Sequence, residues 1–406
     1  MSGIVIIGAG EAGVSAAFTL RQNGFVGQID LFGSEKHLPY ERPPLSKFSI
    51  EGETAAHRPI RTLQDFQDHS IHLHFGRTIS GIDRIRREVR TSDGDTFSYS
   101  KLLLATGAEP RRLPVSGNEH CIYLRTLDNA RQLRQSIKEG TRIAIIGAGF
   151  IGLEVAATAR QKGCEVSVFE GLPRILSRAV PEPIAAILHR RHVEAGVRIL
   201  CNQQLTEITA RGLSKTLHFA DSSTFEADVV IAGIGSSPAT GLAASADLTV
   251  DNGITVDAEL KTDDPNIYAA GDCCSFPIAA YADRHVRLES WRAAQQQGCV
   301  AAANMLGGAL RFEAIPWFWS DQYELTLQVA GLPAFGSQIA RRDGAQGEFL
   351  FHLDENHRII AVSALGEGNS LAKDVRISEM LIAARKAIEP AVLQSSELKL
   401  KSLLAS

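Results

Sequence analysis

Short apolar runs alternate with glycine turns and helical stretches over most of the chain. "GIVII" near the N-terminus and "RIAII" in the second hundred residues have strand length and no polar interruption after their first residue. Such runs are typical of strands buried on both faces of a parallel sheet. Each is followed by a glycine turn, an apolar helical stretch and a second strand, "QIDLFG" or "EVSVFE". The pattern predicts a strand–turn–helix–strand unit that occurs twice, and hence an α/β fold.

The first turn has the spacing G-x-G-x-x-G, with Gly8, Gly10 and Gly13. Gly8 permits the sharp turn, Gly10 leaves room for a pyrophosphate, and Gly13 lets helix and strand pack closely. The N–H groups at the start of the helix can then bind the phosphates. Glu35 lies just beyond the next strand, where an acid can accept hydrogen bonds from an adenosine ribose. In this context the motif predicts a dinucleotide-binding site.

The second turn repeats every part, with Gly147, Gly149 and Gly152 as its glycines and Glu170 at the end of the next strand. The Glu170 carboxylate suits a free 2′-hydroxyl and would repel a 2′-phosphate, so NAD is favoured over NADP. Two arginines soon after Glu170 weaken this preference. Two such turns predict two dinucleotides, of which one is a flavin that stays bound and the other a nicotinamide that comes and goes.

Later strands add to the two repeats. "YSKLLLATG" ends at Thr106-Gly107, "DPNIYAAGD" ends at Gly271-Asp272, and "FEADVVIAGIG" is a similar buried strand. The last part of the chain alternates strand-like runs, "LTLQVAG", "GEFLFHLD" and "RIIAVSALG", with turns, and a helical stretch begins at Ser370. This predicts an α+β domain after the two Rossmann-like domains.

Composition narrows the function. A chain of 406 residues, 44% of them hydrophobic, can form two or three domains. The net charge of −4, without a basic tail, argues against nucleic-acid binding. No apolar run has the ~18–20 residues of a membrane span, and no signal peptide is evident, so we expect no membrane partner and a cytoplasmic protein. The six cysteines form no CxxC motif and no zinc-ligand set, so we expect no metal and reduced, mostly buried thiols.

Taken together, these stretches resemble the two-dinucleotide flavoproteins of the glutathione reductase type. In that superfamily the first site holds FAD, the second holds NAD(P)H, and the acid of the Gly-Asp motif, here Asp272, bonds the ribityl or phosphate region of the flavin. Disulfide reductases carry a cysteine pair where this chain has "LPYERPPLSK". Instead, "PYERPPLSK", "RLESWRAA" and "PWFWSDQYEL" are similar to FAD-dependent NADH:ferredoxin reductases of bacterial oxygenase and P450 systems. The resemblance extends from residue 3 to about residue 390.

The resemblance implies roles for single residues. Arg42, Lys47 and Arg125 match FAD contacts of the family, and Lys47 should lie near flavin N5. Glu154 matches a glutamate near that lysine and the nicotinamide. Lys47 and Glu154 would form the catalytic pair, because a positive charge stabilises an anionic reduced flavin and the carboxylate tunes the lysine. Without the resemblance, Lys47 would be read as an exposed lysine and Glu154 as an acid at a helix start.

Trp291 and Trp319 match family tryptophans beside the flavin and the nicotinamide, although ordinary aromatic packing is the alternative. One departure concerns the ribose. The family often has two acids at the end of the second strand, whereas this chain has Ser34-Glu35. The binding of the FAD ribose would then depend on Glu35.

The resemblance also implies domain boundaries and a reaction. We expect a discontinuous FAD domain over 1–108 and 240–318, an NAD domain over 109–239 and a C-terminal domain over 319–406. NADH would reduce tightly bound FAD, and single electrons would pass to a [2Fe-2S] ferredoxin serving a P450 or a ring-hydroxylating oxygenase. The acidic face of the ferredoxin would bind arginines of this chain. The candidates are Arg284, Arg287, Arg292, Arg341 and Arg342.

Two alternatives remain open. The acceptor could be rubredoxin, a quinone or oxygen, since the fold and both nucleotide sites would be the same. The other alternative is a redox-sensing protein similar to animal apoptosis-inducing factor, which shares several of the motifs. A DNA-binding role of that kind would need a basic surface, and the net charge of −4 argues against one.

Overall fold

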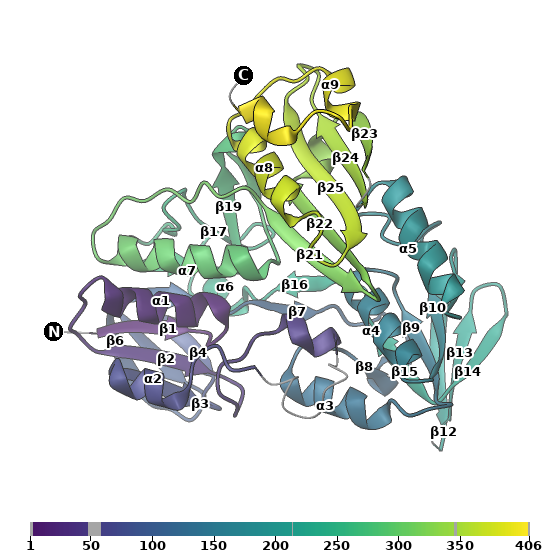
Figure 1. Cartoon of the computed structure of the whole chain (residues 1–406). Coiled ribbons are helices and arrows are strands. Elements are labelled where there is room, and N and C mark those ends of the chain that lie inside the picture. The colour runs from purple at the N-terminus through teal and green to yellow at the C-terminus, as the bar shows by residue number, and fades with distance from the viewer. Residues whose placement is uncertain (1–2, 48–57, 213, 345–346, 405–406) are drawn as a thin grey trace. The chain divides into compact units, whose positions relative to one another are not determined.

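The computed structural model describes residues 3–47, 58–212, 214–344 and 347–404. The chain forms two compact units (Figure 1). The first unit comprises Met1–Glu41, His57–Glu109 and Ser237–Pro316, and the second comprises Arg42–Ala56, Pro110–Ser236 and Trp317–Ser406. Both units are therefore discontinuous in sequence, and the expected boundaries of three domains stay a prediction.

A seven-stranded sheet forms the core of the first unit, with the order β3-β2-β1-β6-β5-β4 and with β18 paired to β6. Its strands are β1 (Gly3–Ile7), β2 (Ile29–Gly33), β3 (Ile71–Phe75), β4 (Ile79–Asp83), β5 (Glu88–Thr91), β6 (Thr96–Leu104) and β18 (Ile267–Ala269). Strands β1, β2, β3, β6 and β18 are joined by parallel pairings, whereas β4 and β5 continue the sheet antiparallel. All five residues of β1 are buried, as its apolar run predicts.

Two helices, α1 and α7, pack against each other in this unit. The helices of the first unit are α1 (Glu11–Gln22), α2 (Leu63–Asp68), α6 (Gly241–Ser245), α7 (Trp291–Met305) and the 3-10 turn η3 (Ala279–Tyr281). A side chain at Gly298 of α7 would overlap the carbonyl oxygen of Ala12, so glycine permits this close approach. A small sheet completes the unit, formed by β17 (Ile254–Thr255), β19 (Cys274–Ile278) and β20 (Arg284–Val286).

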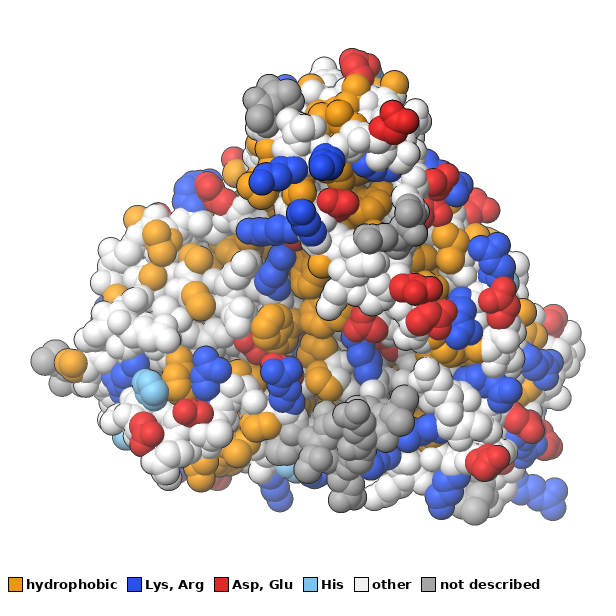
Figure 2. Space-filling view, in the orientation of Figure 1, with side chains coloured by type: hydrophobic (Ala, Val, Ile, Leu, Met, Phe, Trp, Pro, Cys, Tyr) orange, Lys and Arg blue, Asp and Glu red, His pale blue; other side chains and the backbone are white. Residues whose placement is uncertain are grey.

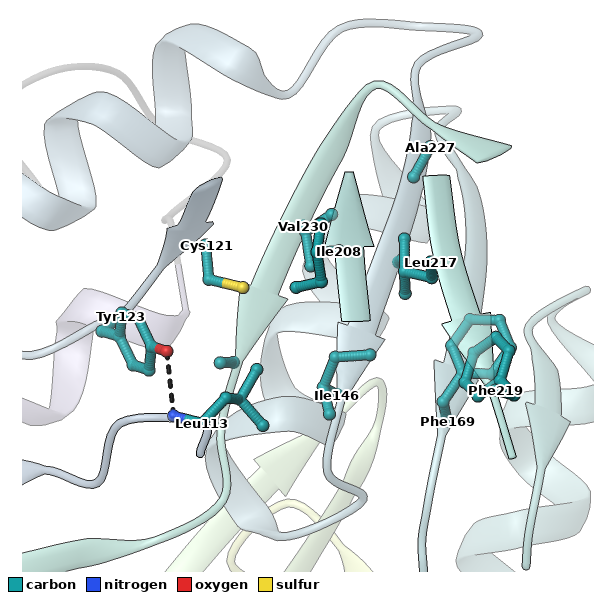
Figure 3. Close-up of a cluster of buried hydrophobic side chains, with 12 residues drawn as sticks. Leu113, Cys121, Tyr123, Ile146, Phe169, Ile208, Leu217, Phe219, Ala227 and Val230 are labelled. Carbon is teal, nitrogen blue, oxygen red and sulfur yellow. Dashed lines mark hydrogen bonds between the residues drawn. The ribbon is translucent and has the colours of Figure 1, made fainter. Parts of the chain in front are cut away.

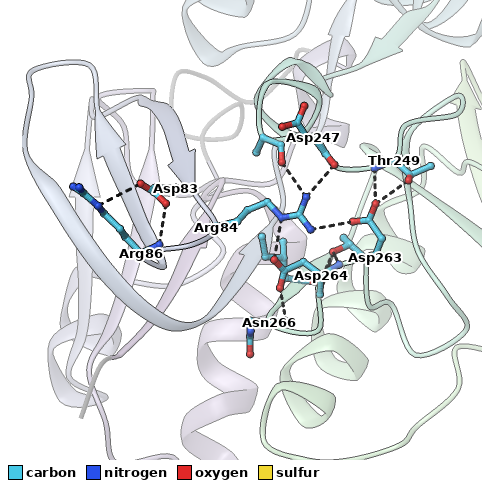
Figure 4. Close-up of polar contacts among 11 residues, drawn as sticks. Asp83, Arg84, Arg86, Asp247, Thr249, Asp263, Asp264 and Asn266 are labelled. Atoms are coloured by element: carbon cyan, nitrogen blue, oxygen red, sulfur yellow. Dashed lines mark hydrogen bonds and ion pairs between the residues drawn. The ribbon is translucent and has the colours of Figure 1, made fainter.

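One arginine joins distant stretches of the first unit (Figure 4). Arg84 follows β4, and its Nε donates to Oδ2 of Asp264 at 3.0 Å. Its Nη1 donates to the carbonyl oxygens of Ala246 at 3.3 Å and Asp247 at 3.0 Å. Arg84 therefore ties the β4–β5 hairpin to the part of the chain that returns to this unit after residue 236.

The second unit contains a five-stranded parallel sheet with the order β11-β10-β9-β15-β8. Its strands are β8 (Cys121–Ile122), β9 (Arg142–Ile146), β10 (Glu165–Phe169), β11 (Arg198–Leu200) and β15 (Val229–Ala232). An antiparallel sheet lies beside it, formed by β12 (Leu205–Arg211), β13 (Ser214–Phe219) and β14 (Thr224–Ala227). The helical segments of this part are η1 (Pro43–Ser46), η2 (Asn118–His120), α3 (Leu127–Ser136), α4 (Phe150–Gln161) and α5 (Glu182–Glu194). The short strands β7 (Ala108–Pro110) and β16 (Ser236–Pro238) pair where the chain passes between the units.

A buried cluster joins these two sheets (Figure 3). Phe169 of β10 stacks on Phe219 of β13 with 4.7 Å between ring centroids. The buried Tyr123 keeps its hydroxyl paired, because Oη accepts a hydrogen bond of 3.0 Å from the backbone N–H of Leu113. The antiparallel sheet thus covers apolar surface of the nucleotide-binding fold.

The last part of the second unit is the predicted α+β segment. An antiparallel sheet has the order β21-β22-β25-β24-β23. Its strands are β21 (Trp317–Gln322), β22 (Leu325–Gly331), β23 (Gln338–Gly344), β24 (Gly347–Leu353) and β25 (Ile359–Glu367). The helical segments are η4 (Pro333–Phe335), α8 (Ala372–Ala383), α9 (Pro390–Gln394) and η5 (Leu400–Leu404). The three predicted strands and the predicted final helical stretch are confirmed. No helix among the described residues is both long and apolar enough to span a bilayer.

Candidate nucleotide-binding and redox sites

The first glycine turn connects β1 to α1. Gly8 has a φ of +114°, and a Cβ there would overlap the carbonyl oxygen of Ala105. A Cβ at Gly13 would overlap the carbonyl oxygen of Gly8. At Gly10, by contrast, a Cβ would meet no described atom within 4 Å. The outer glycines are therefore required by the fold, whereas the middle one leaves open space at the helix N-terminus, as a phosphate site needs.

The other sequence-predicted positions of the first unit follow neighbouring parallel strands. Thr106 and Gly107 come after β6, and Gly271-Asp272 comes after β18, which pairs with β6. The Thr106 hydroxyl donates to the carbonyl oxygen of Ala239 at 2.7 Å. The structure brings these residues to the carboxyl ends of β6, which is next to β1, and of β18, which is next to β6. Nucleotides bind at this edge in open α/β sheets.

Four buried polar atoms near this edge have no hydrogen-bond partner among the described residues. They are Glu11 Oε2, Arg287 Nε, Trp291 Nε1 and Gln297 Nε2. Gln297 also accepts a 2.7 Å hydrogen bond from the N–H of Gly271 through Oε1. Buried polar groups are nearly always paired in folded proteins, so unpaired ones require an explanation. Three of the four are N–H donors, and a bound FAD offers phosphate and carbonyl oxygens, so the residues present fit that cofactor.

Glu35 lies two residues beyond β2 and is half-buried. The Tyr40 hydroxyl donates to its Oε2 at 2.6 Å, which fixes the orientation of the carboxylate. The predicted ribose ligand is thus held in place by a neighbour that the motif did not reveal.

The second glycine turn connects β9 to α4 and has the same design. Gly147 has a φ of +102°, and a Cβ at Gly152 would overlap the carbonyl oxygen of Gly147. A Cβ at Gly149 would meet only the carbonyl oxygen of Gly233, at 3.9 Å. The middle glycine again leaves open space.

Glu170 closes one side of this second turn. Its Oε2 accepts a 2.7 Å hydrogen bond from the N–H of Ala148, and its Oε1 accepts one of 2.9 Å from the N–H of Leu172. Glu170 is half-buried after β10. These two hydrogen bonds fix the carboxylate against the turn. It stays at the end of β10, where an acid can accept hydrogen bonds from an adenosine ribose.

Arg42 and Arg125 lie together in the second unit. Arg42 Nη1 donates to the carbonyl oxygen of Arg125 at 2.6 Å. Arg125 directly precedes Thr126, the N-cap residue of α3, which forms a capping box with Asn129. The two predicted FAD contacts are thus brought together by η1 and by a helix start.

A polar cluster forms where η1, α4 and β21 meet in the second unit. Glu154 of α4 is only 7% exposed. Its Oε2 accepts from the hydroxyl of Ser46 at 2.5 Å, and its Oε1 accepts from the hydroxyl of Ser320 at 2.6 Å. Lys47 Nζ lies 2.5 Å from Oδ2 of Asp321. The cluster contains two carboxyl groups with separate partners.

Trp319 adds to the surroundings of the lysine. Lys47 Nζ lies 5.2 Å from the ring centroid of Trp319, within cation–π range. The Trp319 indole N–H donates to Asp321 Oδ2 at 3.0 Å, and the Thr326 hydroxyl donates to Asp321 Oδ1 at 2.8 Å. Asp321 therefore orients both the lysine and the tryptophan.

Lys47 and Glu154 affect each other through charge. Burial raises the pKa of the Glu154 carboxyl, and the positive charge of Lys47 opposes this, followed by the hydrogen bonds from Ser320 and Ser46. The hydrogen-bonded partner of Lys47 is Asp321. Sequence reasoning missed Ser46, Ser320 and Asp321, although all three stand inside the quoted motifs "PPLSK" and "FWSDQ".

The arginines expected to face an acidic partner differ in exposure. Arg342 is 9% exposed, and its Nη2 donates to the carbonyl oxygens of Ser396 and Leu398. The Arg287 side chain is 12% exposed and pairs with Glu289 at 2.5 Å. Their low exposure makes these two arginines weaker candidates for a docking contact, and the choice of docking arginines stays a prediction. Figure 2 shows positive and negative side chains interspersed on the face in view.

The described cysteines are all free, and four of them are buried. Within the described ranges, three or more histidine, cysteine, aspartate or glutamate side chains nowhere gather as a metal site would need.

Comparison with known proteins decides the family. Residues 2–298 match the pyridine nucleotide-disulphide oxidoreductase family, and residues 317–404 match the reductase C-terminal family. The chain belongs to the pyridine nucleotide-disulphide oxidoreductase family. It is similar to the ferredoxin–NAD(+) reductase component of the p-cumate 2,3-dioxygenase system of Pseudomonas putida. The two are 39% identical over 393 residues, which cover 96% of this chain and 95% of the relative.

Two further relatives of this pyridine nucleotide-disulphide oxidoreductase are informative. Putidaredoxin reductase of Pseudomonas putida is 38% identical over 413 residues, covering 99% of this chain and 97% of the relative. A chain from the crystal structure of the covalent putidaredoxin reductase–putidaredoxin complex matches with a TM-score of 0.93 and 36% identity, covering 100% of this chain and 98% of that one. The predicted glutathione reductase-type fold is confirmed. The chain is an oxidoreductase of the ferredoxin–NAD(+) reductase type, and its family implies binding of FAD and NAD(H).

Proposed function

We propose that this oxidoreductase passes electrons from NADH through tightly bound FAD, one at a time, to a [2Fe-2S] ferredoxin. The ferredoxin would serve a P450 or a ring-hydroxylating oxygenase in the cytoplasm. The observation that carries the proposal is the pair of glycine turns, each closed to side chains at its outer glycines and open at the middle one. A chain with two such sites can hold a resident flavin and a mobile nicotinamide at once.

The first site would hold FAD, which supplies hydride acceptance and single-electron release when bound. The unpaired buried donors beside α1 and α7 support this assignment. The proposed FAD residues are Gly8, Gly10, Gly13, Glu35, Arg42, Lys47, Thr106, Gly107, Arg125, Gly271, Asp272 and Trp291. The FAD domain would comprise 1–108 and 240–318.

The second site would hold NADH within an NAD domain over 109–239. Its proposed residues are Gly147, Gly149, Gly152, Glu170 and Trp319. Glu170 already accepts two backbone hydrogen bonds, so its carboxylate is fixed in place before any coenzyme arrives. A fixed negative charge discriminates against a 2′-phosphate more strongly than a mobile one, because it cannot turn away.

Lys47 and Glu154 would tune the flavin. Lys47 supplies the positive charge, and Asp321 and Trp319 hold its ammonium group. The buried Glu154 provides the opposing carboxyl group, and the hydroxyls of Ser46 and Ser320 fix both of its oxygens. None of these groups is a nucleophile aimed at a substrate, which agrees with electron transfer as the task.

The electron acceptor is inferred from what the chain lacks and from its relatives. The stretch "LPYERPPLSK" has no cysteine pair, so the two-electron disulfide route is missing. Putidaredoxin reductase has been crystallised in a covalent complex with putidaredoxin. Ferredoxin docking would involve the C-terminal domain, 319–406.

The decisive experiment measures cytochrome c reduction by NADH with and without an added [2Fe-2S] ferredoxin. The purified protein should be yellow and should release intact FAD on denaturation. We expect a large ferredoxin-dependent rate. If a panel of such ferredoxins gave no stimulation while rubredoxin, a quinone or oxygen was reduced quickly, the proposed acceptor would be wrong.

A further inference from the structure

A line of buried hydrogen bonds leads from Glu154 to a histidine on α5. Ser320 Oγ lies 2.6 Å from Glu154 Oε1, and Gln322 Nε2 lies 3.1 Å from Ser320 Oγ. Gln322 Oε1 lies 2.9 Å from Nε2 of His192. The Tyr323 hydroxyl lies 3.4 Å from Nδ1 of the same ring. Five side chains from α4, β21 and α5, and from the turn after β21, are thus linked in sequence.

The direction of this chain follows from its first member. An ionised Glu154 carboxylate can only accept, so the Ser320 hydroxyl must donate to it. The lone pairs of Ser320 Oγ then accept from the Gln322 amide N–H. The Gln322 Oε1 atom then faces His192 and can only accept, so Nε2 of His192 must carry the hydrogen. His192 Nδ1 is then an acceptor and can receive the Tyr323 hydroxyl, so every donor points toward Glu154.

The middle of the chain is closed to water. Ser320 and Gln322 are each 1% exposed, and His192 is 0% exposed. Ser320 and Gln322 are two residues apart on β21, so both side chains face the same buried side of the sheet. Hydrogen bonds in such a medium are stronger than in water and polarise one another when aligned.

Burial keeps the histidine neutral. Burial lowers the pKa of His192 to about 4, opposed by its bond to Gln322, and the nearby Arg191 and His189 lower it further. The charged groups that face Glu154 are Lys47 and Asp321. A neutral imidazole carries one N–H only, so the Nε2–H form is the one that completes the chain.

We propose that Ser320, Gln322 and His192 form a one-way hydrogen-bond chain that holds Glu154 as a carboxylate beside Lys47. His192 is then a positioning residue of the redox site, which it never touches. The inference rests on the proposed function for the role of Glu154 beside the flavin. It adds the residues that keep Glu154 ionised. Loss of the chain would let the buried Glu154 carboxyl group take up a proton at higher pH, and Asp321 would then be the remaining carboxylate in this cluster.

The experiment is a pH titration of the Glu154 carboxyl by carbon-13 NMR on the FAD-loaded protein with labelled glutamate. The resonance is assigned by its loss in Glu154→Gln. Removing one hydrogen bond to a charged group should raise the pKa by about 1 to 2 pH units, so Ser320→Ala should show a shift of that size. Gln322→Met and His192→Phe should raise the pKa in the same direction by a smaller amount, because they act through Ser320.

Two further variants separate a positioning role from simple packing. His192→Gln places an amide N–H where the imidazole N–H was, so it should restore most of the original pKa. His352→Gln is the matched control: His352 is 3% exposed, hydrogen-bonds Ser363 at 3.1 Å and has a pKa lowered to about 4 by burial, like His192. It is not part of the chain and should leave Glu154 unchanged.

Nitrogen-15 NMR of the histidines supplies a second readout, since His192 should carry its hydrogen on Nε2 and stay neutral near pH 7. The proposal is overturned if Nδ1 carries the hydrogen, if no variant moves the Glu154 pKa, or if His352→Gln moves it as far as His192→Phe. Should His192→Phe not fold, Gln322→Met carries the same test. None of these signals needs ferredoxin, so failure of this proposal and failure of the proposed function are distinguishable.

Discussion

Glu11 places a carboxyl group where a pyrophosphate is expected. It directly follows Gly10 at the start of α1, and Ser15 donates to its Oε1 at 3.3 Å. Burial raises the pKa of Glu11, the hydrogen bond from Ser15 opposes this, and the negative charge of Glu41 raises the pKa further. The ionised carboxylate is thus a poorly compensated charge in this position.

Replacement of Glu11 by glutamine should therefore stabilise the protein at neutral pH. A carboxyl group whose pKa is raised in the folded state costs stability as pH rises from its ordinary value, 4.5, through the folded value. The gain in unfolding free energy of Glu11→Gln over the unmodified protein should grow across that window and then stay constant. Urea unfolding at about pH 5 and about pH 8 measures it. The exposed Glu109→Gln serves as control, and an equal, pH-independent effect of both variants would contradict the argument.

Glu170 should set the coenzyme preference. A 2′-phosphate would meet its fixed negative charge and lose a hydrogen bond to a charged acceptor, so NADH should exceed NADPH in kcat/KM by at least about tenfold. Glu170→Arg should narrow this gap and also lower NADH affinity, because the N–H groups of Ala148 and Leu172 lose their acceptor. Steady-state kinetics with both coenzymes test the prediction, and equal use of NADH and NADPH by the unmodified protein would refute it.

At the scale of elements, sequence predicted the parts whose geometry is local. The two glycine turns could be read from spacing, because strand, turn and helix are consecutive and each glycine has its own steric reason. The Glu154 cluster could not, since its partners come from η1 and β21, more than a hundred residues away on either side. Spacing along the chain does not predict which hydroxyl group donates to which carboxylate oxygen. Lys47 and Glu154 therefore belong to one cluster, as expected, but the hydrogen-bonded partner of the lysine is Asp321.

The glycines of the first turn should separate folding from cofactor binding. In Gly10→Ala the new methyl group meets no described protein atom, so the protein should fold with nearly unchanged stability but bind FAD much more weakly. In Gly13→Ala the methyl group overlaps the carbonyl oxygen of Gly8, so unfolding free energy should fall by about 1–3 kcal/mol. FAD content, FAD affinity and urea unfolding of both variants give the comparison. Full FAD binding by Gly10→Ala would show that the open space is not the phosphate site.

At the scale of the whole molecule, charge governs the encounter with a partner rather than the fold. The net charge of −4 is small for 406 residues, so attraction to the proposed acidic ferredoxin would have to come from local groups. Arg342 is occupied by backbone carbonyls near the C-terminus, whereas Arg284 on β20 is exposed. Two arginines that the sequence suggested for the same docking surface therefore differ in exposure.

The contrast between these two arginines gives a test of steering. The ferredoxin-dependent rate of cytochrome c reduction should fall as ionic strength rises, because salt screens exposed charges, while direct NADH–ferricyanide turnover should change little. Arg284→Ser should lower the low-salt rate several-fold and flatten its salt dependence. Arg342→Ser should instead lower the unfolding free energy by about 1–3 kcal/mol, because the carbonyl oxygens of Ser396 and Leu398 lose a charged donor. It should leave the slope of rate against salt as it was. Stopped-flow mixing with ferredoxin at several salt concentrations, beside urea unfolding of the same samples, distinguishes the two. If Arg284→Ser kept the full salt dependence, the docking surface would lie elsewhere. Lys47→Ala tests a different site, and it should slow reduction of the flavin by NADH more than it weakens ferredoxin binding.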